Sequence, residues 1–429
     1  MNYNEALNFI HSRDKFGSRP GMERIEALCN AFGNPQDKLK YVHVAGTNGK
    51  GSTCCMIASV LKEAGYRVGL FTSPFVVDFR ERIQLNGEMI LQNELAEIIA
   101  EIKPVVEKLS DDGIEPTEFE IITVAAFLYF LKKNCDIVVL EVGLGGLLDS
   151  TNIIKSSEVS VITSVSLDHT DILGDTLLKI AEHKCGIFKE GGKVVSYPQP
   201  DFAVERFIKE KAKEKHCEYF QHELSKIRLV REELDGSTVI YAGCTFKIPL
   251  TGRHQIYNFA TAAAAINVLK RNGWGITAKS LIDGISKVKM RARTEIVSTS
   301  PLVIIDGGHN AEGIDALCYS LKKFCSDKKI IAVYGMMRDK DHRYSVEKLA
   351  PLCERIYATE ASNPRSLDAE SLAEEVRPFC KKVKAEPFAQ KAFQRALKKA
   401  KNDDAVLVCG SLYLASDIKS YLSDNGLQK

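Results

Sequence analysis

The sequence lacks any apolar run long enough to cross a bilayer. Its longest, residues 121–131, is interrupted by Thr123 and is far shorter than the roughly 20 residues that a membrane helix needs. The first residues, Met1 to Glu5, lack the basic and then apolar layout of a secretion signal. An excess of one charge is also absent, because 58 Lys and Arg against 56 Asp and Glu leave a net charge of +2. These absences predict a cytoplasmic protein with no membrane and no nucleic-acid partner.

Cysteine spacings typical of metal sites are missing as well. The twelve cysteines are scattered, and none forms a Cys-x-x-Cys pair. Cys54 adjoins Cys55, and Cys318 lies seven residues before Cys325, spacings that do not resemble a zinc site. We therefore expect reduced thiols packed in the core of a cytosolic protein.

The composition is that of an ordinary globular protein, with 45% hydrophobic and 27% charged residues over 429 positions. This length suits two or three domains. Apolar runs alternate with helical patterns, which favours parallel sheets covered by helices. The expected strands are 41–45, 67–71, 136–142, 159–165, 193–196, 302–306, 329–334, 355–358 and 405–410. The expected helices are 52–64, 119–133, 255–272, 314–324, 368–379, 390–400 and 412–422.

Residues 227–249 break this alternation. Three short extended runs, 227–230, 237–241 and 245–249, predict a small antiparallel element. We place the domain boundary in the basic stretch 287–293. The prediction is an α/β fold of two domains. Residues 1–293 form a P-loop-type parallel-sheet domain with the antiparallel element, and residues 294–429 form a Rossmann-like α/β domain.

A glycine-rich loop lies between the first expected strand and its helix. Glycines let backbone N–H groups close on phosphate oxygens, and the helix N-terminus adds positive potential. Within it Lys50 can reach the outer phosphates, and Ser52 can approach a metal or a phosphate. The strict P-loop pattern is not met, because Val44 replaces its first glycine and Gly51 is inserted before Ser52. The alternative is a glycine-rich turn with an exposed lysine.

Together with other motifs, this loop resembles the folylpolyglutamate synthase/dihydrofolate synthase family of the Mur ligase superfamily. The matching runs occur in the family's order and cover nearly the whole chain. They are HVAGTNGKGS (43–52), FTSP (71–74), ERI (81–83), EVGLGG (141–146), LDSTN (148–152), DH (168–169), GRHQ (252–255) with Asn258, and DGGHN (306–310).

The resemblance implies ATP and two Mg²⁺ ions as cofactors, with Ser73, Glu141 and His169 as metal ligands. A carboxylate such as Glu141 at the end of a buried strand is costly without a partner, and a metal would supply one. Its alternative is a buried ion pair. Histidine is an unusual ligand for this hard cation, so His169 rests on the resemblance, with a hydrogen-bonded histidine as the alternative.

The resemblance also implies that Lys184 reacts with CO₂ to form a carbamate. This reaction needs the neutral amine, which burial favours by lowering the lysine pKa. The family commonly has alanine after this lysine, where this chain has Cys185. The alternative is an ordinary surface lysine on a helix.

For the nucleotide, the resemblance points to residues in both domains. The Trp-Pro-Gly that precedes the family's arginine is absent, so Arg291 and Arg293 compete for the phosphate contact, and the spacing to Glu295 favours Arg293. The alternative for Asn258 is a polar cluster at a helix start, and that for Asp306 is a capping residue. The implied catalytic residues are Lys50, Lys184 and His309. The implied nucleotide-binding residues are Thr47, Asn48, Gly49, Lys50, Gly51, Ser52, Asn258, Arg293 and Asp306.

The implied activity is ATP-dependent addition of L-glutamate to the glutamyl tail of a folate through an acyl phosphate, in a monomeric enzyme. The sequence leaves open whether dihydropteroate is a second acceptor. Two other hypotheses remain, a different amide ligase of the superfamily and a P-loop ATPase without ligase activity. Near the N-terminus, Arg19 and Arg24 stay unassigned between an acidic-substrate contact and a solvated loop.

Overall fold

The computed structural model describes residues 1–13, 21–222 and 224–425. The chain forms two compact units, each described by itself. In this division the small antiparallel element falls in the second unit, although it precedes residue 293. The first unit contains Met1–Phe75, Phe79–Ile227 and Tyr257–Lys287, and the second contains Val76–Asp78, Arg228–Ile256 and Val288–Lys429.

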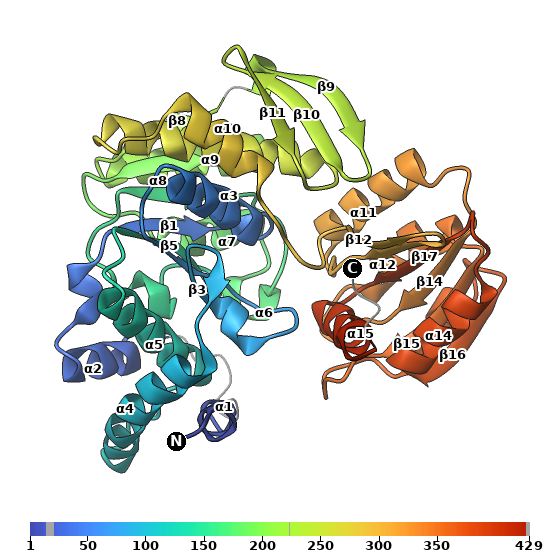
Figure 1. Ribbon diagram of the computed structural model, residues 1–429, viewed down its shortest axis with the longest axis horizontal. Helices are drawn as coiled ribbons and strands as arrows, with labels where there is room; N and C mark the ends of the chain where they lie inside the picture. The colour runs from blue at the N-terminus through green and yellow to red at the C-terminus, as the bar shows by residue number, and fades with distance from the viewer. Residues whose placement is uncertain (14–20, 223, 426–429) are drawn as a thin grey trace. The chain divides into compact units, whose positions relative to one another are not determined.

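An eight-stranded sheet forms the centre of the first unit, in the order β4-β3-β2-β5-β1-β6-β7-β8 (Figure 1). Neighbours from β2 to β8 run parallel, as predicted, whereas β3 and β4 add an antiparallel edge that the sequence analysis missed. The central strands are buried along their whole length, as strands covered on both faces are. The strands are β1 (Tyr41–Ala45), β2 (Val68–Phe71), β3 (Ile83–Leu85), β4 (Glu88–Met89), β5 (Ile137–Glu141), β6 (Val159–Ile162), β7 (Lys193–Ser196) and β8 (Glu218–Gln221).

Helices cover both faces of this sheet. Side chains of α1, α2, α4 and α5 form one continuous apolar cluster with β1, β2 and β5. The expected buried helix 119–133 is confirmed as α5, whose residues from Glu120 to Phe127 are all buried. The helices are α1 (Tyr3–His11), α2 (Glu23–Ala31), α3 (Lys50–Glu63), α4 (Gln92–Asp111), α5 (Glu118–Lys132), α6 (Thr170–Leu173), α7 (Leu177–Cys185), α8 (Phe202–Glu214), α9 (Arg253–Arg271, beginning in residues of the second unit) and α10 (Ala278–Ser286).

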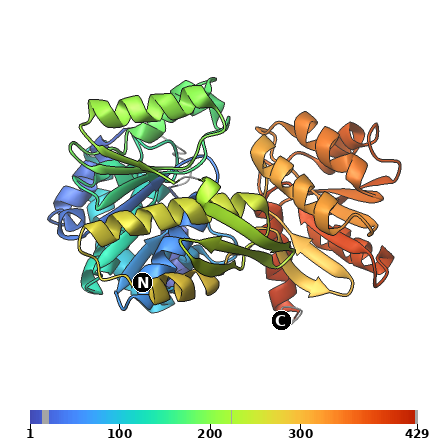
Figure 2. The same ribbon diagram turned by 90° about the horizontal axis from the view of Figure 1, so that it is seen from above.

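The second unit contains a six-stranded sheet in the order β12-β13-β17-β14-β15-β16. Its neighbours are parallel except for β12, which pairs antiparallel with β13. One apolar cluster includes α11, α12 and α13, and another includes α14 and α15, so helices cover both faces (Figure 2). The elements are β12 (Glu295–Thr299), β13 (Leu302–Ile305), α11 (Ala311–Phe324), β14 (Ile330–Tyr334), α12 (His342–Leu349), β15 (Arg355–Glu360), α13 (Ala369–Val376), β16 (Val383–Phe388), α14 (Ala389–Lys399), β17 (Ala405–Cys409) and α15 (Leu412–Asp424).

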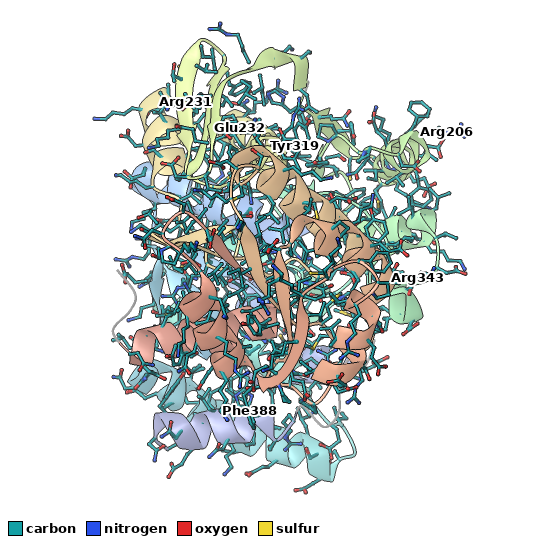
Figure 3. All side chains as sticks on the ribbon, turned by 90° about the vertical axis from the view of Figure 1, so that its right-hand side faces the viewer. Arg206, Arg231, Glu232, Tyr319, Arg343 and Phe388 are labelled. Carbon is teal, nitrogen blue, oxygen red and sulfur yellow. The ribbon has the colours of Figure 1, made fainter. Side chains whose placement is uncertain are left out.

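The predicted antiparallel element is a three-stranded sheet of β9 (Ile227–Glu233), β10 (Gly236–Tyr241) and β11 (Cys244–Ile248). One side chain of β9 ties it to α11. Oε2 of Glu232 accepts hydrogen bonds from Lys323 Nζ at 2.5 Å and Tyr319 Oη at 3.3 Å, and Figure 3 labels Glu232 and Tyr319 next to each other. The Glu232 side chain is almost fully buried, whereas 36% of the Lys323 side chain is exposed.

Two absences in the sequence correspond to structural findings. Within the described residues, no helix combines the length and the hydropathy needed to cross a membrane. All twelve cysteines are free thiols. The expected packing in the core holds for seven of them, whereas Cys55, Cys135, Cys217, Cys244 and Cys353 are only partly buried.

Candidate active site

The glycine-rich loop connects β1 to α3 and is held against the segment that follows β6. The Thr47 N–H donates to Ser164 O at 2.7 Å, and its hydroxyl contacts both the carbonyl and the N–H of Ser166, at 3.0 and 3.1 Å. Lys50 Nζ donates to the carbonyls of Gly46 and Thr47, each at 3.0 Å, so its ammonium lies over the loop. The supporting segment 163–166 carries no motif that the sequence analysis used.

Gly49 is required at the start of α3 for two reasons. Its φ of +82° is in the left-handed region, and a Cβ there would overlap the amide oxygen of Asn258. The structure therefore brings Asn258 of α9 against the loop within the first unit. The N-cap of α3 is this glycine, which has no side chain to cap the helix, so the first turn resembles helix N-termini that bind phosphate.

Ser73 and Glu141 lie together at one end of the same sheet. Glu141 is the last residue of β5 and is 4% exposed, and its Oε2 accepts the backbone N–H of Ser73 at 3.1 Å. A serine hydroxyl beside a carboxylate is a set of hard oxygen donors, which fits Mg²⁺. Among the described residues, no three His, Cys, Asp or Glu side chains are grouped to hold a metal ion.

His169 immediately precedes α6 and is less enclosed. Its φ of +50° is unusual for a residue other than glycine, and its backbone N–H donates to Asp168 Oδ1 at 2.9 Å. The ring Nε2 lies 4.0 Å from the same oxygen, with 43% of the side chain exposed. The role of His169 as a metal ligand stays a prediction.

Lys184 lies in the last turn of α7 and is only 3% exposed, which excludes the alternative of an ordinary surface lysine. Burial lowers its pKa from 10.5 to about 7, and the nearby charge of Lys50 acts in the same direction, against Asp168. A large share of this amine is thus neutral at neutral pH, the form that reacts with CO₂. The electrostatic influence of Lys50 also indicates that the two lysines are neighbours.

In the second unit, Asp306 follows β13 and is buried. Its Oδ2 accepts the N–H and the hydroxyl of Thr294 at 2.8 and 2.9 Å, and its Oδ1 accepts the Gly308 N–H at 2.7 Å. Thr294 has φ +48°, a costly conformation for a β-branched residue. The Asp306 carboxylate therefore holds the turn that carries Arg293.

Three more polar residues lie around this turn. Burial lowers the pKa of His254, Asp306 opposes that effect and Arg293 adds to it, so Arg293 is close to the ring. Arg293 is half-buried, whereas Arg291 is exposed. His309 Nδ1 lies 2.9 Å from Gly307 O, and the side chain of Asn310 caps α11 by accepting the Gly313 N–H.

The two arginines near the N-terminus have separate outcomes. Arg19 lies outside the described residues. Arg24 forms an ion pair with the buried Glu120, with Nε 3.0 and 3.2 Å from its two carboxylate oxygens. This contact gives Arg24 a structural task in holding α2 to α5.

Comparison with known proteins decides the family. Residues 44–266 match the Mur ligase middle domain, and residues 292–412 match the glutamate ligase domain of Mur ligases. The chain is 37% identical to the dihydrofolate synthase/folylpolyglutamate synthase of Bacillus subtilis, over 98% of this chain and 99% of the relative. The chain belongs to the folylpolyglutamate synthase/dihydrofolate synthase family. The folylpolyglutamate synthase of Lacticaseibacillus casei is 35% identical, with 98% and 99% of the two chains covered.

Solved structures of this family share the fold. The Escherichia coli enzyme in complex with DHPP and ADP superposes with a TM-score of 0.87 at 30% identity, covering 99% of both chains. A folylpolyglutamate synthase–AMPPCP complex gives 0.84 at 32% identity, covering 99% of this chain and 100% of the other. The three-stranded sheet lies within the matched middle domain, although it packs in the second compact unit.

Proposed function

We propose that this chain adds L-glutamate to the glutamyl tail of a folate in a reaction driven by ATP. It is an ATP-dependent ligase of the folylpolyglutamate synthase/dihydrofolate synthase family. The observation that carries the proposal is the loop of residues 46–52, with a glycine as the N-cap of α3 and the Lys50 ammonium over the loop's carbonyls. Relatives solved with ADP or AMPPCP support ATP as the co-substrate.

The proposed reaction has two steps. A carboxylate oxygen of the folate attacks the γ-phosphorus, the bond to the bridging oxygen breaks, and ADP leaves with that oxygen. The glutamate amine then attacks the acyl carbon of the resulting acyl phosphate, and inorganic phosphate and a proton are released. Lys50 and the N–H groups of the first turn of α3 stabilise the charge on the transferred phosphoryl group.

Two Mg²⁺ ions are part of the proposal, because phosphoryl transfer to an anionic carboxylate needs charge neutralisation. Ser73 and Glu141 supply oxygen donors of the right kind, and His169 is the third proposed ligand. When bound, the metal neutralises phosphate charge and orients the γ-phosphate.

Lys184 is proposed to act as its carbamate. Addition of CO₂ to the neutral amine forms a C–N bond and releases a proton, which converts a buried cation into an anion. The burial of Lys184 and the lowered pKa support this modification.

In the second unit, Arg293 is the proposed phosphate contact rather than Arg291, because Arg293 lies on the turn that Asp306 holds. Asp306 and Asn258 are proposed nucleotide contacts. His309, whose Nδ1 lies 2.9 Å from Gly307 O, is the third proposed catalytic residue, and we propose that it faces the reacting groups.

A second acceptor, dihydropteroate, is proposed because the Bacillus subtilis and Escherichia coli relatives carry the names of both activities. A monomeric state, a cytoplasmic location and the domain bounds 1–293 and 294–429 also remain proposals.

The test is glutamate-dependent phosphate release by Lys50→Ala and by the matched variant Lys62→Ala, an exposed lysine on the same helix. We expect Lys50→Ala to lose about a hundredfold or more of turnover with unchanged circular dichroism. Lys62→Ala keeps the parent rate. An active Lys50→Ala enzyme would contradict the assigned role.

A further inference from the structure

Three buried polar side chains form a hydrogen-bonded series that joins β1 to residues 149–151. His43 of β1 is fully buried, and its Nε2 lies 2.9 Å from the Thr151 hydroxyl. That hydroxyl lies 2.5 Å from Asp149 Oδ1. The sequence analysis used these residues only as parts of motifs and assigned them no role.

The donor and the acceptor of each hydrogen bond in this series can be assigned. Burial raises the pKa of Asp149. The N–H groups of Thr151 at 3.0 Å and Leu144 at 2.8 Å donate to its carboxyl group, which acts against this rise and places Asp149 as an acceptor. Thr151 therefore donates its single hydroxyl proton to Asp149 and accepts from His43 Nε2–H. Burial, aided by the charge of Lys189, lowers the pKa of His43 to about 3, so the ring is neutral and carries its proton on Nε2.

Thr151 and Asp149 belong to residues 143–152, here named the 143–152 loop. This loop caps the C-terminus of α7. The Leu147 N–H donates to His183 O at 2.7 Å, and Asn152 Nδ2 donates to Gly186 O at 3.1 Å. These bonds satisfy carbonyls that a helix end leaves without partners.

The 143–152 loop and the C-terminal end of α7 pack in close contact. A Cβ on Gly146 would lie 2.6 Å from His183 O and 3.1 Å from Lys184 O, and one on Gly186 would overlap the backbone of Leu147. A shift of the loop must therefore shift the turn that carries Lys184. At the other end of this hydrogen-bonded series, His43 lies on β1, three residues before the start of the phosphate loop at Gly46.

We propose that His43 is a positioning residue of the ligase reaction, which through Thr151 and Asp149 holds the 143–152 loop and with it Lys184 in register with the phosphate loop. This inference rests on the proposed function. It assigns His43 the task of a hydrogen-bond donor and no contact with substrate.

Four variants test the role of the hydrogen bond. His43→Leu and Thr151→Val remove one partner each, the double variant removes both, and His43→Gln restores an N–H donor. Tyr41→Phe is the control, because it removes another buried hydrogen bond from the same face of β1, to Gln36 O at 2.8 Å. We expect each single variant to lower kcat about tenfold or more with an unchanged KM for ATP. The double variant should be no slower than the singles, and His43→Gln should recover most of the rate.

Hydrogen exchange supplies a readout that needs no catalysis. The proposal predicts faster amide exchange in residues 143–152 and 183–188 of His43→Leu and Thr151→Val, with unchanged exchange in β1 and β5. Tyr41→Phe should change neither region. Parent kcat in both single variants, additive losses in the double variant, or exchange that rises throughout the unit would overturn the proposal.

The two arms also separate this inference from the proposed function. If the parent enzyme shows no glutamate-dependent phosphate release, the proposed function fails. Amide hydrogen exchange would still show whether His43 holds the 143–152 loop. If His43→Leu does not fold, Thr151→Val decides, since valine matches threonine in shape.

Discussion

Lys184 makes folding stability depend on pH in a way that can be calculated. Its pKa falls from 10.5 to about 7 on burial. Since one pKa unit corresponds to about 1.4 kcal/mol, the buried ammonium costs about 5 kcal/mol of folding free energy below pH 7, where both states are protonated. Between pH 7 and 10.5 the unfolded state binds more protons, so stability rises with pH. Above 10.5 both states are neutral and the cost disappears.

Lys184→Met removes this cost and keeps an unbranched side chain of similar length. In CO₂-free buffer, we expect the variant to unfold with a free energy up to about 5 kcal/mol higher than the parent at pH 6. The difference should shrink through the range from 7 to 10.5. Urea unfolding can be followed through Trp274, the one tryptophan of the chain, which lies in the first unit and donates to Glu158 at 3.1 Å.

Lys179→Met is the matched control, because Lys179 lies on the same helix with 60% of its side chain exposed. This control should show no comparable dependence on pH. If Lys184→Met is no more stable than the parent at pH 6, or if the gain persists unchanged to pH 11, the buried ammonium does not carry the cost assigned to it. The supporting argument for a carbamate at this lysine would then fail too.

Three further predictions concern the rest of the site. Gly49→Ala should reduce phosphate release about tenfold or more, because its Cβ overlaps a neighbour, whereas Gly65→Ala, also at positive φ but with open space, should cost only about 1 kcal/mol and no activity; equal activities would contradict the packing argument. Glu141→Gln should raise the Mg²⁺ concentration for half-maximal rate about tenfold, and an unchanged Mg²⁺ titration would remove it from the metal site. Asp306→Asn turns a donor towards the Thr294 N–H, so urea unfolding should show a loss of about 1–3 kcal/mol and kinetics a raised KM for ATP; parental values of both would show that the turn does not depend on the carboxylate.

The sequence predicted best what local pattern determines. The strand 41–45 and the strand 193–196 have the predicted bounds, because each contains two valines in a short run of the kind that forms buried parallel strands. The helix 119–133 is shifted by one residue. The short edge strands β3 and β4 were missed, since two or three residues carry no readable alternation.

Long-range contacts account for what could not be predicted. The packing of the three-stranded sheet with α11 depends on Glu232 and Lys323, which are 91 residues apart. Likewise, only the folded chain shows that Thr151 meets His43 across 108 residues. The motif around Asp306 predicted a polar site. The hydrogen bond from the Thr294 N–H to Asp306 was not predictable, because it depends on a turn with a positive φ at Thr294 that residue types do not reveal.

The most direct test of the central claim is phosphate release with ATP and Mg²⁺, with and without L-glutamate, comparing tetrahydrofolate and dihydropteroate as acceptors. The account predicts release that requires both glutamate and tetrahydrofolate, and release with dihydropteroate if the enzyme is bifunctional. Phosphate release at the same rate with and without L-glutamate would indicate an ATPase. No release with either acceptor, from folded protein that binds ATP, would contradict folate as the substrate.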